Sequence, residues 1–333
     1  MVRMATELLL LGTAGAPLPV AGRAGISSAL VVDGRVFVVD CGRGTPSGYA
    51  GAGLDFAHLT GVFLTHLHVD HVGDLAGLLL YPWGVRVSPD GPVPPVHVYG
   101  PGRPAQLPDG GADGLRRQTV IHPELPDPGT SDLVGHVLAG YAYHLNVMPL
   151  DAAMPDPAQL VRVTDIALDR EPGHPAAPAV VLDGQGVRVS TVAVTHGHAR
   201  PALAYRFDTP DGAVVFSGDT TVNDDLIALA RGADILVHSV ADLGYLARHG
   251  WAGAALDRMA GLHTDVTEVG GVAERAGVGE LILTHYLPAE PGAVSEADWA
   301  GRAAHGFRGR VTAGRDGLRR AVPAPGAEPA RAQ

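Results

Sequence analysis

The sequence predicts an α+β protein in which two mixed β-sheets pack face to face between outer helices, an αββα sandwich. Apolar runs typical of strands occur near both ends of the chain, at residues 8–11 and 281–283. Asp33-Gly34, Asp183-Gly184 and Asp211-Gly212 lie between apolar runs, and such dipeptides favour tight hairpin turns. Because several strands end in a histidine or an aspartate, we expect a functional site at one edge of the sandwich.

The clearest hairpin spans residues 29–39, with Asp33-Gly34 at its turn. Residues 74–81 are predicted to form a short helix that Pro82 ends. Two more helices are expected at residues 224–231 and 267–276, the second with Thr264 or Thr267 as its N-cap.

Long surface loops are predicted around residues 84–180, where stretches 86–130 and 149–178 are rich in Pro, Gly and Asp. Residues 1–318 are expected to form a single domain. Residues 319–333 have the composition of a disordered tail.

Composition limits the possible function classes. A chain of 333 residues, 46% of them hydrophobic, can bury a large core. The formal net charge is −11, which argues against a protein that grips nucleic acid through a general basic field. Cys41 is the only cysteine, so no intramolecular disulfide can form. No apolar run is long enough to cross a membrane, and we expect a cytoplasmic protein.

The most informative segment is Thr65-His66-Leu67-His68-Val69-Asp70-His71, directly after the apolar run at residues 62–64. Imidazole nitrogen and carboxylate oxygen are ligands that suit Zn²⁺, Mn²⁺ and Fe. A single histidine is more often structural than a ligand. Four such residues within six positions at a strand end favour a metal site.

This His-x-His-x-Asp-His pattern resembles the signature of the metallo-β-lactamase superfamily. The resemblance implies the αββα sandwich, with metals bound at one edge. It also implies two adjacent divalent ions, Zn²⁺ or else Mn²⁺ or Fe. His66 and His68 would bind the first ion, and Asp70 and His71 the second.

Three downstream segments resemble the remaining ligand motifs of that family. Thr195-His196-Gly197 implies His196, rather than His198, as a ligand of the first ion. Ser217-Gly218-Asp219-Thr220 implies that Asp219 bridges both ions, and Leu283-Thr284-His285 implies His285 as the last ligand of the second.

The implied reaction is hydrolysis, since two close metals can share a hydroxide with a pKa near 7. We expect Asp70 to serve in catalysis as well as in metal binding. His263 lies at a position that resembles the family's His-Ser-Thr loop. It is the candidate proton donor to the leaving group, although it could equally cap or pack near the following helix.

The branch of the superfamily that resembles this chain best contains arylsulfatase-like, phosphodiesterase-like and ribonuclease Z-like enzymes. Our main interpretation is a hydrolase of a small phosphodiester, sulfate or carboxylic ester, with nucleic acid an unlikely partner and a homodimer possible. The alternative is a ribonuclease Z-like endoribonuclease that processes tRNA 3′ ends.

Two departures place the ribonuclease Z alternative second. His238 resembles a histidine that is followed by glutamate in that family, but here the next residue is Ser239. Only residues 197–218 separate His196 from Asp219, which is too few for the basic tRNA-binding arm of ribonuclease Z. A third reading is a non-catalytic metal-binding protein on the same fold. It is disfavoured because all seven expected ligands are present.

Overall fold

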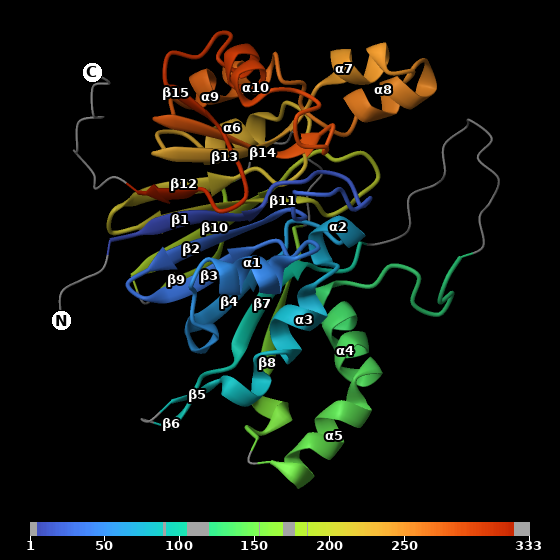
Figure 1. Ribbon diagram of the computed structural model, residues 1–333, viewed down its shortest axis with the longest axis vertical. Coiled ribbons are helices and arrows are strands. Elements are labelled where there is room, and N and C mark those ends of the chain that lie inside the picture. Colours follow the sequence, from blue (N-terminus) through green and yellow to red (C-terminus); the bar gives the residue numbers. More distant parts are fainter. Residues whose placement is uncertain are drawn as a thin grey trace.

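The computed structural model describes residues 5–88, 91–104, 120–152, 154–168, 177–184 and 186–322. Two seven-stranded mixed sheets stack on each other, and helices cover the outer face of each (Figure 1). The predicted αββα sandwich is confirmed. Among the described residues, no helix is both long and apolar enough to cross a bilayer.

The first sheet contains most of the N-terminal strands. In spatial order these are β16 (Arg319–Ala321), β1 (Glu7–Gly12), β2 (Ser27–Val32), β3 (Arg35–Val39), β4 (Leu59–Phe63), β7 (Val96–Pro101) and β8 (Val161–Ile166). From β3 to β8 the neighbouring strands run parallel, so their carboxyl ends share one edge. A separate short hairpin joins β5 (Val87–Ser88) to β6 (Gly91–Pro92).

The second sheet combines an antiparallel half with a parallel half. Its spatial order is β15 (Arg310–Ala313), β14 (Glu280–Leu287), β13 (Ile235–Ala241), β12 (Gly212–Phe216), β11 (Leu203–Thr209), β10 (Val187–Ala193) and β9 (Ala179–Gly184). Strands β12 to β15 are parallel, and therefore end at a common edge.

Helices flank the two sheets separately (Figure 1). The helices on the side of the first sheet are α1 (Thr45–Gly51), α2 (Val69–Val72), α3 (Leu75–Leu80), α4 (Thr130–Gly140) and α5 (Ala142–Asp151). Those on the side of the second sheet are α6 (Asp224–Leu229), α7 (Leu243–Arg248), α8 (Ala254–Ala260), α9 (Val269–Ala276) and α10 (Glu296–Ala303). Short 3-10 turns occur at η1 (Phe56–His58), η2 (Trp83–Val85) and η3 (Pro157–Gln159).

Aromatic side chains hold the two sheets together. Phe63 of β4 meets Phe207 of β11 edge to face, with ring centroids 4.9 Å apart, and Phe37 of β3 packs against the same ring. Two further apolar layers bury the outer faces of the sheets under their helices. This packing fixes the edge of one sheet against the edge of the other.

The stretch predicted as long loops is more ordered than expected. It contains β7, β8, α4 and α5. Helices α4 and α5 were not predicted because they bury few side chains. Helix α4 buries Thr130 and Val134, and α5, which contains Pro149, buries only Leu145. An amphipathic pattern is weak where so little of a helix is covered.

Two smaller expectations also needed correction. Helix α9 has Glu268 as its N-cap, because Thr264 donates instead to the Thr220 carbonyl and Thr267 to Asp265. The expected tail begins too early, since β16 at Arg319–Ala321 pairs with β1. Residues 323–333 lie outside the described part of the chain.

Candidate metal centre

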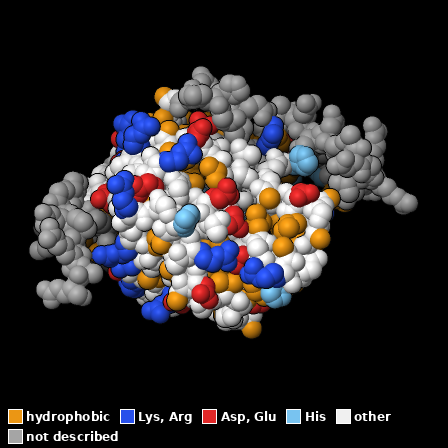
Figure 2. Space-filling model, turned by 90° about the horizontal axis from the view of Figure 1, so that it is seen from above, with side chains coloured by type: hydrophobic (Ala, Val, Ile, Leu, Met, Phe, Trp, Pro, Cys, Tyr) orange, Lys and Arg blue, Asp and Glu red, His pale blue; other side chains and the backbone are white. Residues whose placement is uncertain are grey.

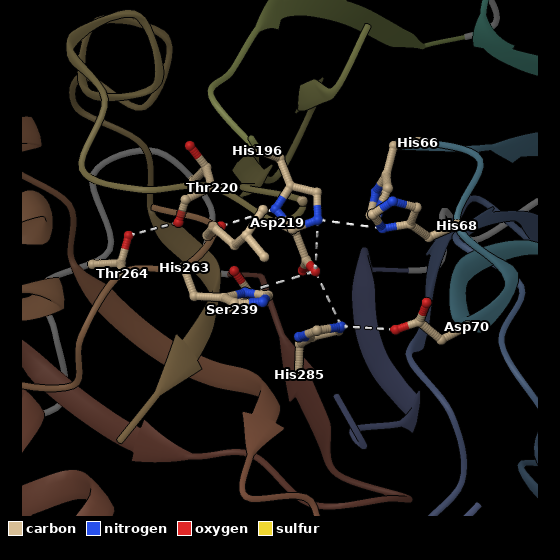
Figure 3. A network of polar contacts seen from close by, with 12 residues as sticks. His66, His68, Asp70, His196, Asp219, Thr220, Ser239, His263, Thr264 and His285 are labelled. Carbon is tan, nitrogen blue, oxygen red and sulfur yellow. Dashed lines mark hydrogen bonds and ion pairs between the residues drawn. The ribbon is translucent and has the colours of Figure 1, made fainter. Parts of the chain in front are cut away.

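The residues singled out in the sequence converge on one edge of the sandwich. His66 and His68 follow β4, Asp70 and His71 lie in α2, and His196 follows β10. The remaining three come from the second sheet and its connections, with Asp219 after β12, His263 after α8 and His285 in β14. Figure 3 labels all of these residues except His71 and shows the labelled side chains pointing toward one another from separate elements.

One cluster contains His66, His68 and His196. The Nε2 atom of His66 lies 3.0 Å from Nδ1 of His68, which in turn lies 3.3 Å from Nε2 of His196. His66 and His196 are buried, whereas His68 is exposed, so the cluster is open to solvent on the His68 side. His198, two residues beyond His196, is exposed.

A second cluster contains Asp70, His71 and His285. Nε2 of His285 lies 3.2 Å from Nε2 of His71 and 3.4 Å from Oδ2 of Asp70. Oδ2 of Asp219 connects the clusters, at 3.2 Å from His285, 3.5 Å from His71 and 3.8 Å from His196. A carboxylate between two histidine groups has the position that a bridging ligand needs.

Strand β11 anchors the loop that carries the first histidines. The Tyr205 hydroxyl donates to the Leu64 carbonyl at 2.8 Å, and the Leu203 amide donates to the Thr65 carbonyl at 2.8 Å. Both bonds run from the second sheet to the first. The His66 loop is therefore held by the packing of the two sheets.

Asp40, which the sequence reasoning passed over, orients His71. Its buried carboxylate accepts from Nδ1 of His71 at 2.8 Å and from the amide and hydroxyl of Thr65. A proton on Nδ1 leaves Nε2 free to face the cluster. Burial disfavours the charged form of His71, but Asp40 and Asp219 raise its pKa well above its usual value. The signal was present, since Asp40 ends an apolar strand just as Asp219 does.

A backbone carbonyl plays the same part for His196. Nδ1 of His196 donates to the Leu262 carbonyl at 2.8 Å, which leaves Nε2 facing the first cluster. The next residue along, His263, places Nδ1 3.8 Å from Oδ2 of Asp219. One loop after α8 therefore orients a predicted ligand and supplies the predicted proton donor.

His285 has a backbone conformation that side chains rarely adopt, with φ at 50°. Its Nε2 faces the cluster, and the opposite side of the ring packs on Gly15. A Cβ built at Gly15 would lie 2.8 Å from Nδ1 of His285 and 2.8 Å from the Tyr286 carbonyl oxygen. Gly15 is thus required for His285 to occupy this position.

Burial and mutual charge control the protonation of the cluster. Burial lowers the pKa of His66 well below its ordinary value, and it lowers the pKa of His263 to about 3. Burial opposes a charge on Asp219 as well, but His285 and His71 hold its pKa well below the usual range. At neutral pH, Asp219 is therefore an anion and His263 a neutral imidazole.

Divalent cations fit this donor set. Ring nitrogens of different histidines face each other at hydrogen-bond distance. The outward nitrogens of His71 and His196 are already bonded to Asp40 and to a carbonyl. Four groups of three residues place potential ligand atoms within 4.8 Å of one another. Imidazole and carboxylate together suit Zn²⁺, Mn²⁺ and Fe.

The family model described as the Metallo-beta-lactamase superfamily matches residues 21–285 of this chain. The chain belongs to that superfamily. Its fold implies divalent metal ions, and the His/Asp clusters agree with it. The protein is a metal-dependent hydrolase.

Curated relatives narrow the branch. A Ribonuclease Z of Mycobacterium sp. (strain KMS) is 35% identical over 317 residues, which cover 93% of this chain and 94% of the relative. A Ribonuclease Z of Mycobacterium avium (strain 104) is 35% identical over 96% of this chain and 99% of the relative. The chain thus lies in the ribonuclease Z-like branch of the superfamily.

Solved structures share the fold at lower sequence identity. The human tRNase Z, short form, superposes with a TM-score of 0.62 at 18% identity, covering 95% of this chain and 99% of that one. The metallo-beta-lactamase fold protein YhfI from Bacillus subtilis gives the same TM-score, identity and coverage.

These relatives correct the expectation of a small ester substrate with nucleic acid as an unlikely partner, which was wrong: the curated relatives are ribonucleases. Net charge is an average over the whole surface and says little about one binding face. The interval at residues 197–218 does hold only the β11–β12 hairpin, as the sequence suggested. The similarity to ribonucleases Z extends over nearly the whole chain despite this short interval.

Proposed function

We propose that this protein is an endoribonuclease of the ribonuclease Z type, which cleaves precursor tRNA at its 3′ end with the aid of two divalent cations. We propose Zn²⁺ as the identity of these cations. The observation that carries the proposal is 35% identity to ribonucleases Z over nearly the whole chain. The complete His/Asp set at one edge supports it. A tRNA substrate would place the reaction in the cytoplasm.

The chain would hold one cation with His66, His68 and His196 and the other with Asp70, His71 and His285, while Asp219 contacts both. Bound cations supply Lewis acidity toward the scissile phosphate and lower the pKa of water. Asp40 and the Leu262 carbonyl keep the protons of His71 and His196 on Nδ1, away from the cluster.

We assign His263 to the leaving oxygen. Its ring is buried beside Asp219 and neutral at pH 7, since burial lowers its pKa to about 3. The negative charge of a bound phosphate would raise the pKa of this ring, and the imidazolium so formed would give its proton to the oxygen that leaves phosphorus and return to the neutral form. Asp70, which is half-buried with Oδ2 3.4 Å from Nε2 of His285, would orient the attacking water.

The proposal is tested with a labelled precursor tRNA that carries a 3′ trailer, incubated with Zn²⁺- or Mn²⁺-loaded protein, and the cleavage position is mapped. We expect cleavage where the 3′ trailer joins the tRNA, lost in Asp219→Ala and kept in Asp257→Ala, a variant of an exposed aspartate in α8. Bis(p-nitrophenyl) phosphate serves as a probe of phosphodiester hydrolysis that does not depend on RNA recognition. Turnover of the probe without cleavage of any precursor tRNA would refute the RNA assignment.

The roles of two neighbouring histidines separate in a second experiment. His196→Ala should lose metal, measured by elemental analysis after gel filtration, whereas His198→Ala should bind as much as the unaltered protein. His263→Ala should keep its metal and lose about 10²–10⁴ in kcat, the usual contribution of a proton-transfer group. Loss of metal in His263→Ala would make that residue a ligand instead.

A further inference from the structure

A small cavity lies behind Asp219, between the two sheets. It is lined from the first sheet by Asp40 and Thr65 and from the second by Ser217, Ser239 and Thr284, with His285 and several apolar side chains. The centre of a water-sized molecule has about 20 Å³ available in it. One water needs roughly 10–15 Å³ by this measure, so the space is sufficient.

Part of the polar lining is already hydrogen-bonded within the protein. Thr65 donates to Asp40, which also accepts from His71. The Ser217 hydroxyl donates to the Gly218 carbonyl at 2.6 Å and accepts from the Ser239 amide at 3.1 Å. These groups need nothing further from the cavity.

Four polar atoms of the lining residues have no partner: Oγ of Ser239, Oγ1 of Thr284, Oδ1 of Asp219 and Nδ1 of His285. Nδ1 of His285 lies against Gly15, which leaves the three oxygens. The residues that carry these oxygens are at most 5% exposed. Ser239 and Thr284 are paired across the parallel strands β13 and β14, so their side chains lie next to each other on one face of the sheet. Unsatisfied buried polar atoms are rare in folded proteins, and three such oxygens around one cavity indicate a common partner.

We propose that this cavity holds an ordered water that accepts from the hydroxyls of Ser239 and Thr284 and donates to Oδ1 of Asp219. Three hydrogen bonds are the usual number for a buried water. The water holds the inner oxygen of Asp219, and thereby directs Oδ2 toward the histidines of both clusters. Ser239 and Thr284 are positioning residues, which act on the metal site through Asp219.

Residue 239 is also where the ribonuclease Z-like sequences were expected to carry glutamate. A serine side chain is shorter than that of glutamate by the terminal carboxylate, and the space beside it remains open on the side of Asp219. In this chain the small side chain and the water together take a place that a longer side chain would fill.

The test uses near-isosteric variants of the full-length protein. Thr284→Val and Ser239→Ala, singly and together, remove the hydroxyls with little change in volume, and Thr284→Ser keeps one. Ser27→Ala is the matched control, because its hydroxyl is equally buried and unpartnered but does not line the cavity. The Zn²⁺ dissociation constant is measured by competition with a chromophoric chelator, and circular dichroism verifies folding.

We expect the double variant to bind Zn²⁺ about 10–100-fold more weakly, as found when groups behind a metal ligand are removed. Thr284→Ser and Ser27→Ala should stay within about twofold of the unaltered protein, within the scatter of such measurements. A crystal structure of the unaltered protein should show the water, and that of the double variant should lack it. An empty cavity in the crystal structure, or an unchanged Zn²⁺ affinity in the double variant, would overturn the proposal. If the double variant does not fold, the Zn²⁺ affinity of Thr284→Val and the crystal structure of the unaltered protein test the proposal instead.

The inference rests on metal binding by Asp219, which belongs to the proposed function, and not on the RNA substrate. If the protein binds Zn²⁺ but does not cleave precursor tRNA, the proposed function is refuted, and the test of the water can still be carried out. If the variants that lack the hydroxyls bind Zn²⁺ as tightly as the unaltered protein, only the inference about the water is refuted.

Discussion

At the scale of single residues, the site depends on side chains that are not ligands. Asp40 holds His71, the Leu262 carbonyl holds His196, and Gly15 leaves room for His285. Each acts on the face of an imidazole that points away from the cluster. Groups behind the ligands thus fix which nitrogen His71 and His196 offer and where His285 lies, and changes there should alter metal binding without removing a ligand.

Gly15→Ala is the sharpest test at this scale. The added methyl group would press on His285 and on backbone oxygens, which cannot move freely. We expect an unfolding free energy lower by about 1–3 kcal/mol and a weaker second metal site, measured by denaturant titration and by metal stoichiometry. Gly135→Ala in α4 meets nothing within 4 Å and should instead gain about 0.5–1 kcal/mol. Equal stability of the two variants would contradict the steric argument.

At the scale of elements, one ion pair joins the helices beside the site. Asp242 is fully buried, caps α7 by accepting from the Tyr245 amide at 2.6 Å, and pairs with Arg302 of α10. Burial opposes its charge, but Arg302 and the Tyr245 amide lower the pKa of Asp242 below its usual value. The pair therefore stabilises the fold above the ordinary carboxyl pKa, and this stability is lost as pH falls below about 4.

Arg302→Ala should leave Asp242 buried without its partner. Because the arginine is about one-third exposed, we expect a loss of about 1–3 kcal/mol at pH 7, less than for a fully buried pair. The difference from the unaltered protein should shrink in urea titrations below pH 4. Arg275→Ala removes an exposed pair with Asp224 and should cost at most ~0.5 kcal/mol. A larger effect for Arg275 would reverse this ranking.

At the scale of the whole molecule, charge is distributed without a broad basic field on the face seen in Figure 2. Arginine and acidic side chains are interspersed there, with uncharged surface between them. Arg275, Arg302 and Arg308 are paired with acids. The net charge of −11 is therefore not offset by a continuous cationic surface on this face. We infer that recognition of a polyanionic substrate depends on the site and its surroundings.

Removal of metal should weaken the whole fold, because the proposed ligands come from both sheets. A cation bound only by the native state adds about 2.7 kcal/mol at a free concentration 100 times its Kd. We expect the Tm to fall by several degrees when a chelator replaces excess Zn²⁺, as followed by calorimetry. Asp219→Ala should show a much smaller shift. Identical Tm values with and without Zn²⁺ in the unaltered protein would contradict binding by the folded state.

The sequence by itself determined the strand ends, because each is a local pattern of apolar residues with a polar end. Through its resemblance to the metallo-β-lactamase superfamily, it also determined the αββα class and the residues that meet at the site. The helices α4 and α5 and the strand β16 could not be read in this way, since sparse burial leaves little periodicity. Only the tertiary structure decided that Asp40, Gly15 and the Leu262 carbonyl support the ligands. Those contacts join segments far apart in the chain, and the stacking of the two sheets brings them together.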